Sequence, residues 1–179
     1  MVTRLSAFAA VALALCLGLG AAATGAGARP ATTVAAAQVL QRQVLVELNV
    51  VRRAHGLPPL RGSSPLSAAA GAHSRAMATH GFFAHESLDG SAFWRRVKRY
   101  YAPGPSGGWS VGENLLWSTP GIGAAEAVKL WMESPGHRRN ILTARWREIG
   151  ISAVTASAAP GVYGGRDVVI VTTDFGARS

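Results

Sequence analysis

Three short segments of this chain carry histidine and glutamate among glycine, aromatic and turn-forming residues. They are residues 81–90 with His85, residues 112–115 with Glu113, and residues 131–142 with Glu133 and His137. Imidazole and carboxylate are the side chains that bind a divalent cation or transfer protons near neutral pH. If the fold brings the three segments together, they form a site with two histidines and at least one acid.

His137 occupies a position that favours a neutral imidazole. Ser134 is a plausible N-cap and Pro135 a plausible first helical residue, which would place His137 in the first turn of a helix. The positive end of the helix dipole disfavours the imidazolium ion there, and the neutral ring is the form that binds metal. The role of His85 is left open, because its segment is equally consistent with a structural and a functional histidine.

The two acids differ in their surroundings. Glu113 stands between Gly112 and Asn114, ahead of the apolar Leu115 and Trp117. A carboxylate among apolar neighbours is costly unless it is paired, so we expect Glu113 to pair with a histidine, for structure or for chemistry. Glu133 directly precedes the predicted cap at Ser134, where an acid is ordinarily stabilised by the helix dipole.

The remaining candidates have structural interpretations. His73 shares a predicted helical stripe with Leu66, Ala70 and Met77, and we expect a core histidine bonded to the backbone. Standard catalytic signatures are missing: His85 does not begin an H-E-x-x-H motif, and neither a G-x-S-x-G elbow nor a phosphate-binding loop occurs.

The N-terminus has the pattern of a secretory signal. Arg4 precedes an apolar run over residues 7–20, and small residues at 26–28 fit a cleavage site, so residues 1–28 are predicted to be a signal peptide. The alternative is an uncleaved anchor, but the run is shorter than the roughly 20 residues that a span needs. The only cysteine, Cys16, lies inside this segment, so the exported remainder would fold without disulfides. We expect a linker at 29–37 and one domain over 38–179.

The charge is strongly basic, with 18 Lys and Arg against 9 Asp and Glu, a net charge of +9. A basic exported protein is attracted to anionic wall polymers and lipid headgroups. Nucleic acid is not expected as a partner, and no stable membrane span should remain after cleavage. The densest basic run, residues 95–99, is interpreted as a solvated helix face.

Periodicity predicts helices first and strands last. Helices are expected over 39–54, 64–79, 91–100 and 124–132, and strands over 112–117, 146–154 and 167–175. No βαβ repeat occurs, and this order favours an α+β layered domain over a doubly wound sheet.

Six patches in this order resemble the CAP superfamily, which comprises cysteine-rich secretory proteins, antigen 5 and pathogenesis-related proteins. The patches are Leu48-Asn49 with Arg52, His73-Ser74 with Met77, residues 81–85, residues 112–115, residues 131–142 and Glu148-Ile149-Gly150. The chain is most similar to the small bacterial SCP-like members, over about residues 40–176.

The resemblance implies a three-layer α-β-α sandwich with a mainly antiparallel central sheet. It also implies a cleft with two histidines and two acids, which map to His85, His137, Glu113 and Glu133. Family members bind divalent cations, often zinc, through the two histidines, and some bind sterols or fatty acids.

Three hypotheses follow. We favour a secreted, non-enzymatic protein that binds zinc or another divalent cation through His85 and His137, and an extracellular ligand such as a lipid, a wall component or a protein. The alternative is a hydrolase of peptides or cell wall, with Glu113 as general acid/base beside a His-bound metal water. In the third, the His/Glu set is a purely structural brace.

Overall fold

The computed structural model describes residues 30–179, and the predicted signal segment lies outside the described residues. In chain order the elements are α1 (Pro30–Ala54), β1 (Arg61–Gly62), α2 (Ser64–His80), α3 (Phe93–Tyr100), β2 (Trp109–Ser118), α4 (Ala124–Glu133), α5 (Pro135–Ile141), β3 (Glu148–Ala159), η1 (Gly161–Tyr163) and β4 (Arg166–Arg178). Every predicted helix and strand is present; apart from the much earlier start of α1, their ends are shifted by a few residues. No helix within residues 30–179 combines the length and apolarity that crossing a membrane requires.

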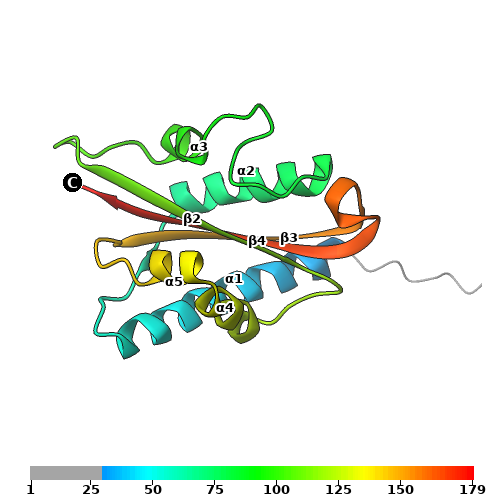
Figure 1. Ribbon diagram of the computed structural model, residues 1–179, viewed down its shortest axis with the longest axis horizontal. Helices are drawn as coiled ribbons and strands as arrows, with labels where there is room; N and C mark the ends of the chain where they lie inside the picture. Colours follow the sequence, from blue (N-terminus) through cyan, green and yellow to red (C-terminus); the bar gives the residue numbers. More distant parts are fainter. Residues whose placement is uncertain (1–29) are drawn as a thin grey trace, which may run out of the picture.

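The elements form three layers, as the α+β prediction required. Helices α1, α4 and α5 cover one face of the sheet, and α2 and α3 cover the other (Figure 1). Side chains alternate along β4: Val169, Val171 and Phe175 enter the core under α1 and α4, whereas Val168 and Ile170 enter the core under α2. A strand covered on both faces buries both sets of side chains, which explains its continuous apolar and β-branched sequence.

The sheet has the strand order β1-β3-β4-β2 and is mixed. Strands β3 and β2 pair antiparallel with β4, whereas β1 pairs parallel with β3. The expectation of a mainly antiparallel sheet is corrected in one respect: the sheet is mixed, because the short edge strand β1 joins it in parallel. Strand β1 has only two residues, both exposed, so no alternation in the sequence could reveal it.

Helix α1 is longer than predicted. It begins at Pro30, so residues 30–37 of the expected linker are helical. Alanine has the highest helix propensity, and proline is tolerated at the first helical position, which together explain this extension. Ala37 lies in this extension and packs against the core, so the end of the extension nearest Leu40 belongs to the domain.

Helix α2 lies very close to β3. A Cβ atom on Gly150 would collide with the backbone of Leu66 and Ser67. This contact fixes the height of α2 above the sheet, and with it the position of His73 and of the chain segment that leads to His85.

Candidate functional site

The three segments singled out in the sequence converge on one cleft. It has a volume of about 410 Å³ and lies beside the edge strand β2, between the loop that follows α2 and the start of α5. Its lining residues are His85, Glu113, Asn114, Ser134, Gly136, His137, Arg139, Asn140 and Thr143. Both histidines and the first acid therefore face a common space.

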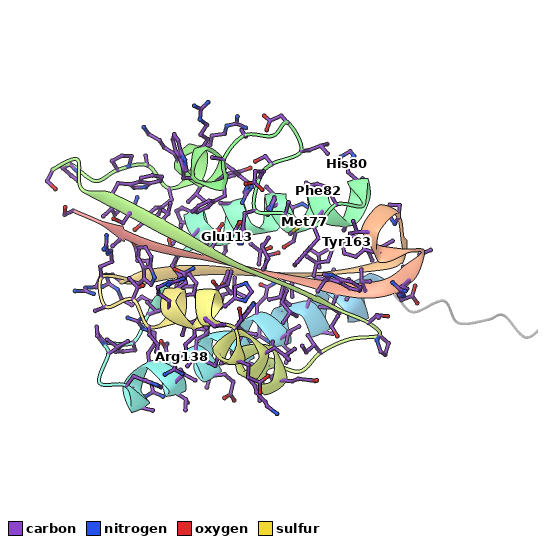
Figure 2. The ribbon with its side chains drawn as sticks, in the orientation of Figure 1. Met77, His80, Phe82, Glu113, Arg138 and Tyr163 are labelled. Atoms are coloured by element: carbon purple, nitrogen blue, oxygen red, sulfur yellow. The ribbon has the colours of Figure 1, made fainter. Side chains whose placement is uncertain are left out.

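Glu113 is the buried anchor of this site, with its side chain only 1% exposed. Glu113 is labelled in Figure 2. One of its carboxylate oxygens, Oε1, lies 2.8 Å from Nδ1 of His85, and the other, Oε2, accepts a hydrogen bond from the guanidinium of Arg96. The expected pairing of Glu113 with a histidine is thus confirmed. Because both oxygens are engaged, Glu113 holds other groups in place.

The bond to Glu113 sets the chemistry of His85. A carboxylate can only accept, so Nδ1 donates, and the neutral ring then carries its free lone pair on Nε2. The same bond is the main reason that the pKa of His85 is raised, and burial opposes it. Arg96 also donates to the backbone oxygen of His85 at 3.3 Å and to the hydroxyl of Ser87 at 3.1 Å, which fixes the loop.

His137 lies in the first turn of α5, as its sequence position indicated. Burial, followed by the charge of His85, lowers its pKa, which favours the neutral ring. A chain of amides holds this helix against β2: Asn140 Nδ2 donates to Asn114 Oδ1 at 2.9 Å, and Asn114 Nδ2 donates to the His137 carbonyl at 3.2 Å. Ser134 is the N-cap residue, although its side chain makes no capping bond.

Glu133 does not join the other three residues. It ends α4, its side chain is 58% exposed, and it lies 3.9 Å from Lys129 one turn earlier. It is not among the residues that line the cleft. The buried Trp131 turns the opposite side of α4 toward the core, and this rotation leaves Glu133 in solvent.

Two ionisable residues at the site were not predicted as site residues. Arg96 was interpreted as part of a solvated face, yet it is buried and bound to Glu113. Asp174 is completely buried on β4, directly opposite Glu113 in the strand register. Burial, and then the charge of Glu113, raises the pKa of Asp174 well above its usual range, which favours the neutral acid. A single acid within an apolar, β-branched strand is the sequence pattern that could have indicated the buried Asp174.

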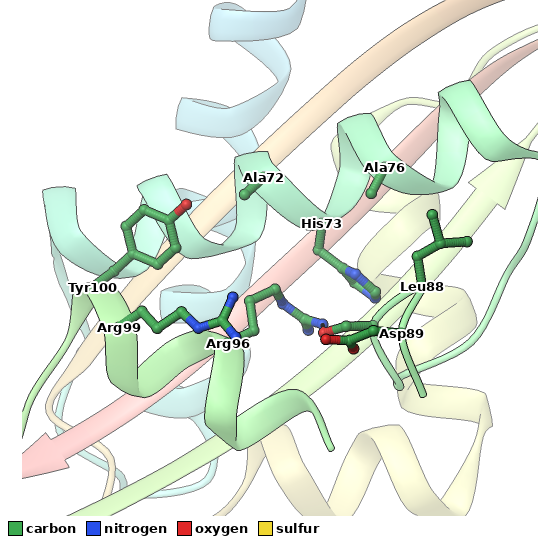
Figure 3. A pocket seen from close by; sticks show the side chains of 9 residues that line it. Ala72, His73, Ala76, Leu88, Asp89, Arg96, Arg99 and Tyr100 are labelled. Atoms are coloured by element: carbon green, nitrogen blue, oxygen red, sulfur yellow. Dashed lines mark hydrogen bonds between the residues drawn. The ribbon is translucent and has the colours of Figure 1, made fainter. Parts of the chain in front are cut away.

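His73 lies behind the site and plays the structural part expected of it. It is 1% exposed, and its Nε2 lies 2.8 Å from the carbonyl of Ala84, the residue before His85. A second cavity of about 520 Å³ opens on that side, between α2, α3 and the intervening loop (Figure 3). Arg96 lines this cavity while binding Glu113, so it separates the two hollows.

Within residues 30–179, no group of three or more His, Cys, Asp or Glu is arranged to hold a metal together. His85 and His137 are the two histidines that line the cleft.

Comparison with known proteins identifies the family. Residues 45–173 match the model of the cysteine-rich secretory protein family, CAP. The chain belongs to the CAP family. This CAP chain is 30% identical over 129 residues to the uncharacterized protein YkwD of Bacillus subtilis, an alignment that covers 71% of the chain and 48% of YkwD. It is also 28% identical over 111 residues to the uncharacterized membrane protein YlbC of the same species, covering 62% of the chain and 30% of YlbC. The chain thus spans half or less of these relatives.

Solved structures support the fold. An extracellular protein containing an SCP domain, from Bacillus anthracis, superposes with a TM-score of 0.66 at 23% identity, over 86% of this chain and 45% of that one. An outer surface protein of Borrelia burgdorferi gives a TM-score of 0.64 at 18% identity, over 77% of this chain and 92% of that one. These likenesses confirm the CAP sandwich.

Proposed function

We propose that this CAP protein acts outside the cytoplasm and binds one divalent cation, such as zinc, through His85 and His137. The observation that carries the proposal is the convergence of both imidazoles on one cleft, with Nδ1 of His85 bound to the buried Glu113. A carboxylate behind a histidine is the usual arrangement around metal-binding imidazoles, because it fixes the tautomer and orients the ring.

The surrounding residues supply what such a site needs. Arg96 holds Glu113, Glu113 holds His85, and the amide chain through Asn114 holds α5 with His137. The burial that lowers the pKa of His137 keeps its ring neutral and able to bind. A cation bound by two imidazoles keeps open positions for water or for an oxygen of a ligand, so the site suits reversible binding.

Isothermal calorimetry with zinc tests this proposal. We expect one binding site in the wild type, and at least about tenfold weaker binding in His85→Ala and in His137→Ala. His80→Ala is the matched control, because His80 is exposed at the end of α2 and does not line the cleft. Zinc binding that is absent, or that is unchanged in both cleft variants, would refute the site.

The extracellular location rests on the predicted signal segment and on relatives described as extracellular and outer-surface proteins. N-terminal sequencing of the secreted protein is the direct test, with a start near residue 29 as the expected result. The ligand would be a lipid, a wall component or a protein. The hydrolase alternative has less support, because both oxygens of Glu113 are already bound.

A further inference from the structure

One end of the molecule gathers arginines that are far apart in the sequence. Residues 48–62 and 134–147 contain seven arginines and neither aspartate nor glutamate. Arg52 is buried and structural, since its guanidinium donates to the carbonyls of Ile141 and Thr143. The other six are exposed, and we call them the arginine surface. It consists of Arg53, Arg61, Arg138, Arg139, Arg145 and Arg147.

Backbone contacts place these arginines together. The bonds from Arg52 join the C-terminal end of α1, where Arg53 lies, to the end of α5. The backbone N–H of Arg61 donates to the carbonyl of Arg147 at 3.0 Å, so β1 lies against the segment that follows α5. Figure 1 shows the ends of α1 and α5 and the start of β3 on the same side of the molecule, and Figure 2 labels Arg138 there.

The charge of this surface is not neutralised. In residues 30–179, none of the six arginines forms an ion pair. The nearest acid in sequence, Glu148, is occupied by Tyr101 and Arg178. An unpaired cluster of one sign attracts a partner of the opposite sign, and arginine forks bind phosphate oxygens in pairs.

The surface is continuous with the histidine cleft. Arg139 lines the cleft together with His85 and His137, and Arg138 is its neighbour on α5. An extended anion lying across the arginines would therefore also reach the cleft. Several separated cations on one face suit a chain of regularly spaced charges better than a single small ion.

We propose that the arginine surface binds an anionic wall polymer whose repeat units are joined by phosphodiester groups. This inference names the extracellular ligand of the proposed function, but it depends on the arginines and not on the cation.

The probe is poly(glycerol phosphate), titrated into the full-length mature protein with a chelator present at several salt concentrations. The test variant combines Arg138→Gln, Arg139→Gln and Arg145→Gln, whose side chains make no hydrogen bond within residues 30–179. We expect at least about tenfold weaker binding. The slope of log affinity against log salt should fall by about two to three, because each lost phosphate contact removes about 0.7 to 0.9.

The matched control combines Arg95→Gln, Lys98→Gln and Arg99→Gln on α3, which removes the same charge elsewhere. It should keep the wild-type slope, and the melting temperatures of both variants should equal that of the wild type. No binding to the polymer, or equal loss in both variants, would overturn the proposal. Equal or tighter binding to phosphatidylglycerol vesicles or single-stranded DNA would overturn the choice of polymer. Because a chelator is present, failure of zinc binding would leave this result standing.

Discussion

Replacing Glu113 by alanine should destabilise the fold far more than any exposed substitution. The change removes the counter-charge of Arg96, which is itself only 7% exposed, and the acceptor of His85 Nδ1. Breaking a buried ion pair from one side costs about 3 to 5 kcal/mol, because the remaining charge stays buried and unpaired. In a protein of this size each kcal/mol lowers the melting temperature by about 2 to 4 °C, so a drop of about 6 to 20 °C is expected.

Thermal and urea unfolding followed by circular dichroism measure this effect. Glu133→Ala is the matched control, since it removes a 58% exposed acid whose ion pair with Lys129 is worth only about 0.3 to 0.5 kcal/mol. Adding Arg96→Met to Glu113→Ala should recover part of the loss, because it removes the orphaned charge. The reasoning is wrong if Glu113→Ala lowers the free energy of unfolding no more than Glu133→Ala does. It is also wrong if adding Arg96→Met to Glu113→Ala lowers the free energy of unfolding by as much as Arg96→Met does alone.

Three further predictions concern the same region. In metal-free protein, NMR titration should place His85 above and His137 below the free-histidine pKa of about 6.5. Since the pKa of His85 is raised in the folded protein, the stabilisation that His85 contributes is fully present below about pH 6.5 and is lost as the pH rises through its folded pKa. A measured pKa of His85 at or below about 6.5 would contradict this prediction. Gly150→Ala should lower the free energy of unfolding in urea by about 1 to 3 kcal/mol or more, because α2 must move away from β3. The control Gly136→Ala has open space around its Cβ and should be neutral or stabilising by up to about 1 kcal/mol, so equal effects of the two substitutions would disprove the close contact. Asp174→Asn at pH 7 should change stability by less than about 1 kcal/mol, because the amide resembles the neutral acid, and a loss above about 3 kcal/mol would show that Asp174 is ionised.

Much of the fold could be predicted because periodicity reports directly on burial. The stripe through Leu66, Ala70 and Met77 predicted α2, and these residues are buried in the structure. The β-branched run over 167–175 predicted a strand, and the structure shows that β4 is covered on both faces. A very short strand could not be predicted from periodicity. Strand β1 has two residues, both exposed, and its pairing with β3 depends on contacts distant in the sequence.

The candidate site was predictable only where chemistry and local structure coincided. His137 could be placed in a first helical turn by Ser134 and Pro135, and Glu113 could be given a partner from the cost of burying a carboxylate. Arg96 could not be separated from the exposed basic residues beside it, because which side of α3 faces Glu113 depends on the packing of that helix.

Anomalous X-ray diffraction from a zinc-soaked crystal of the mature protein tests the central claim most directly. We predict a single strong peak in the cleft, at about 2.0 to 2.1 Å from a ring nitrogen of each of His85 and His137, with Glu113 still bound to Nδ1 of His85. A cleft without a peak, or zinc bound only at other histidines, would contradict the account.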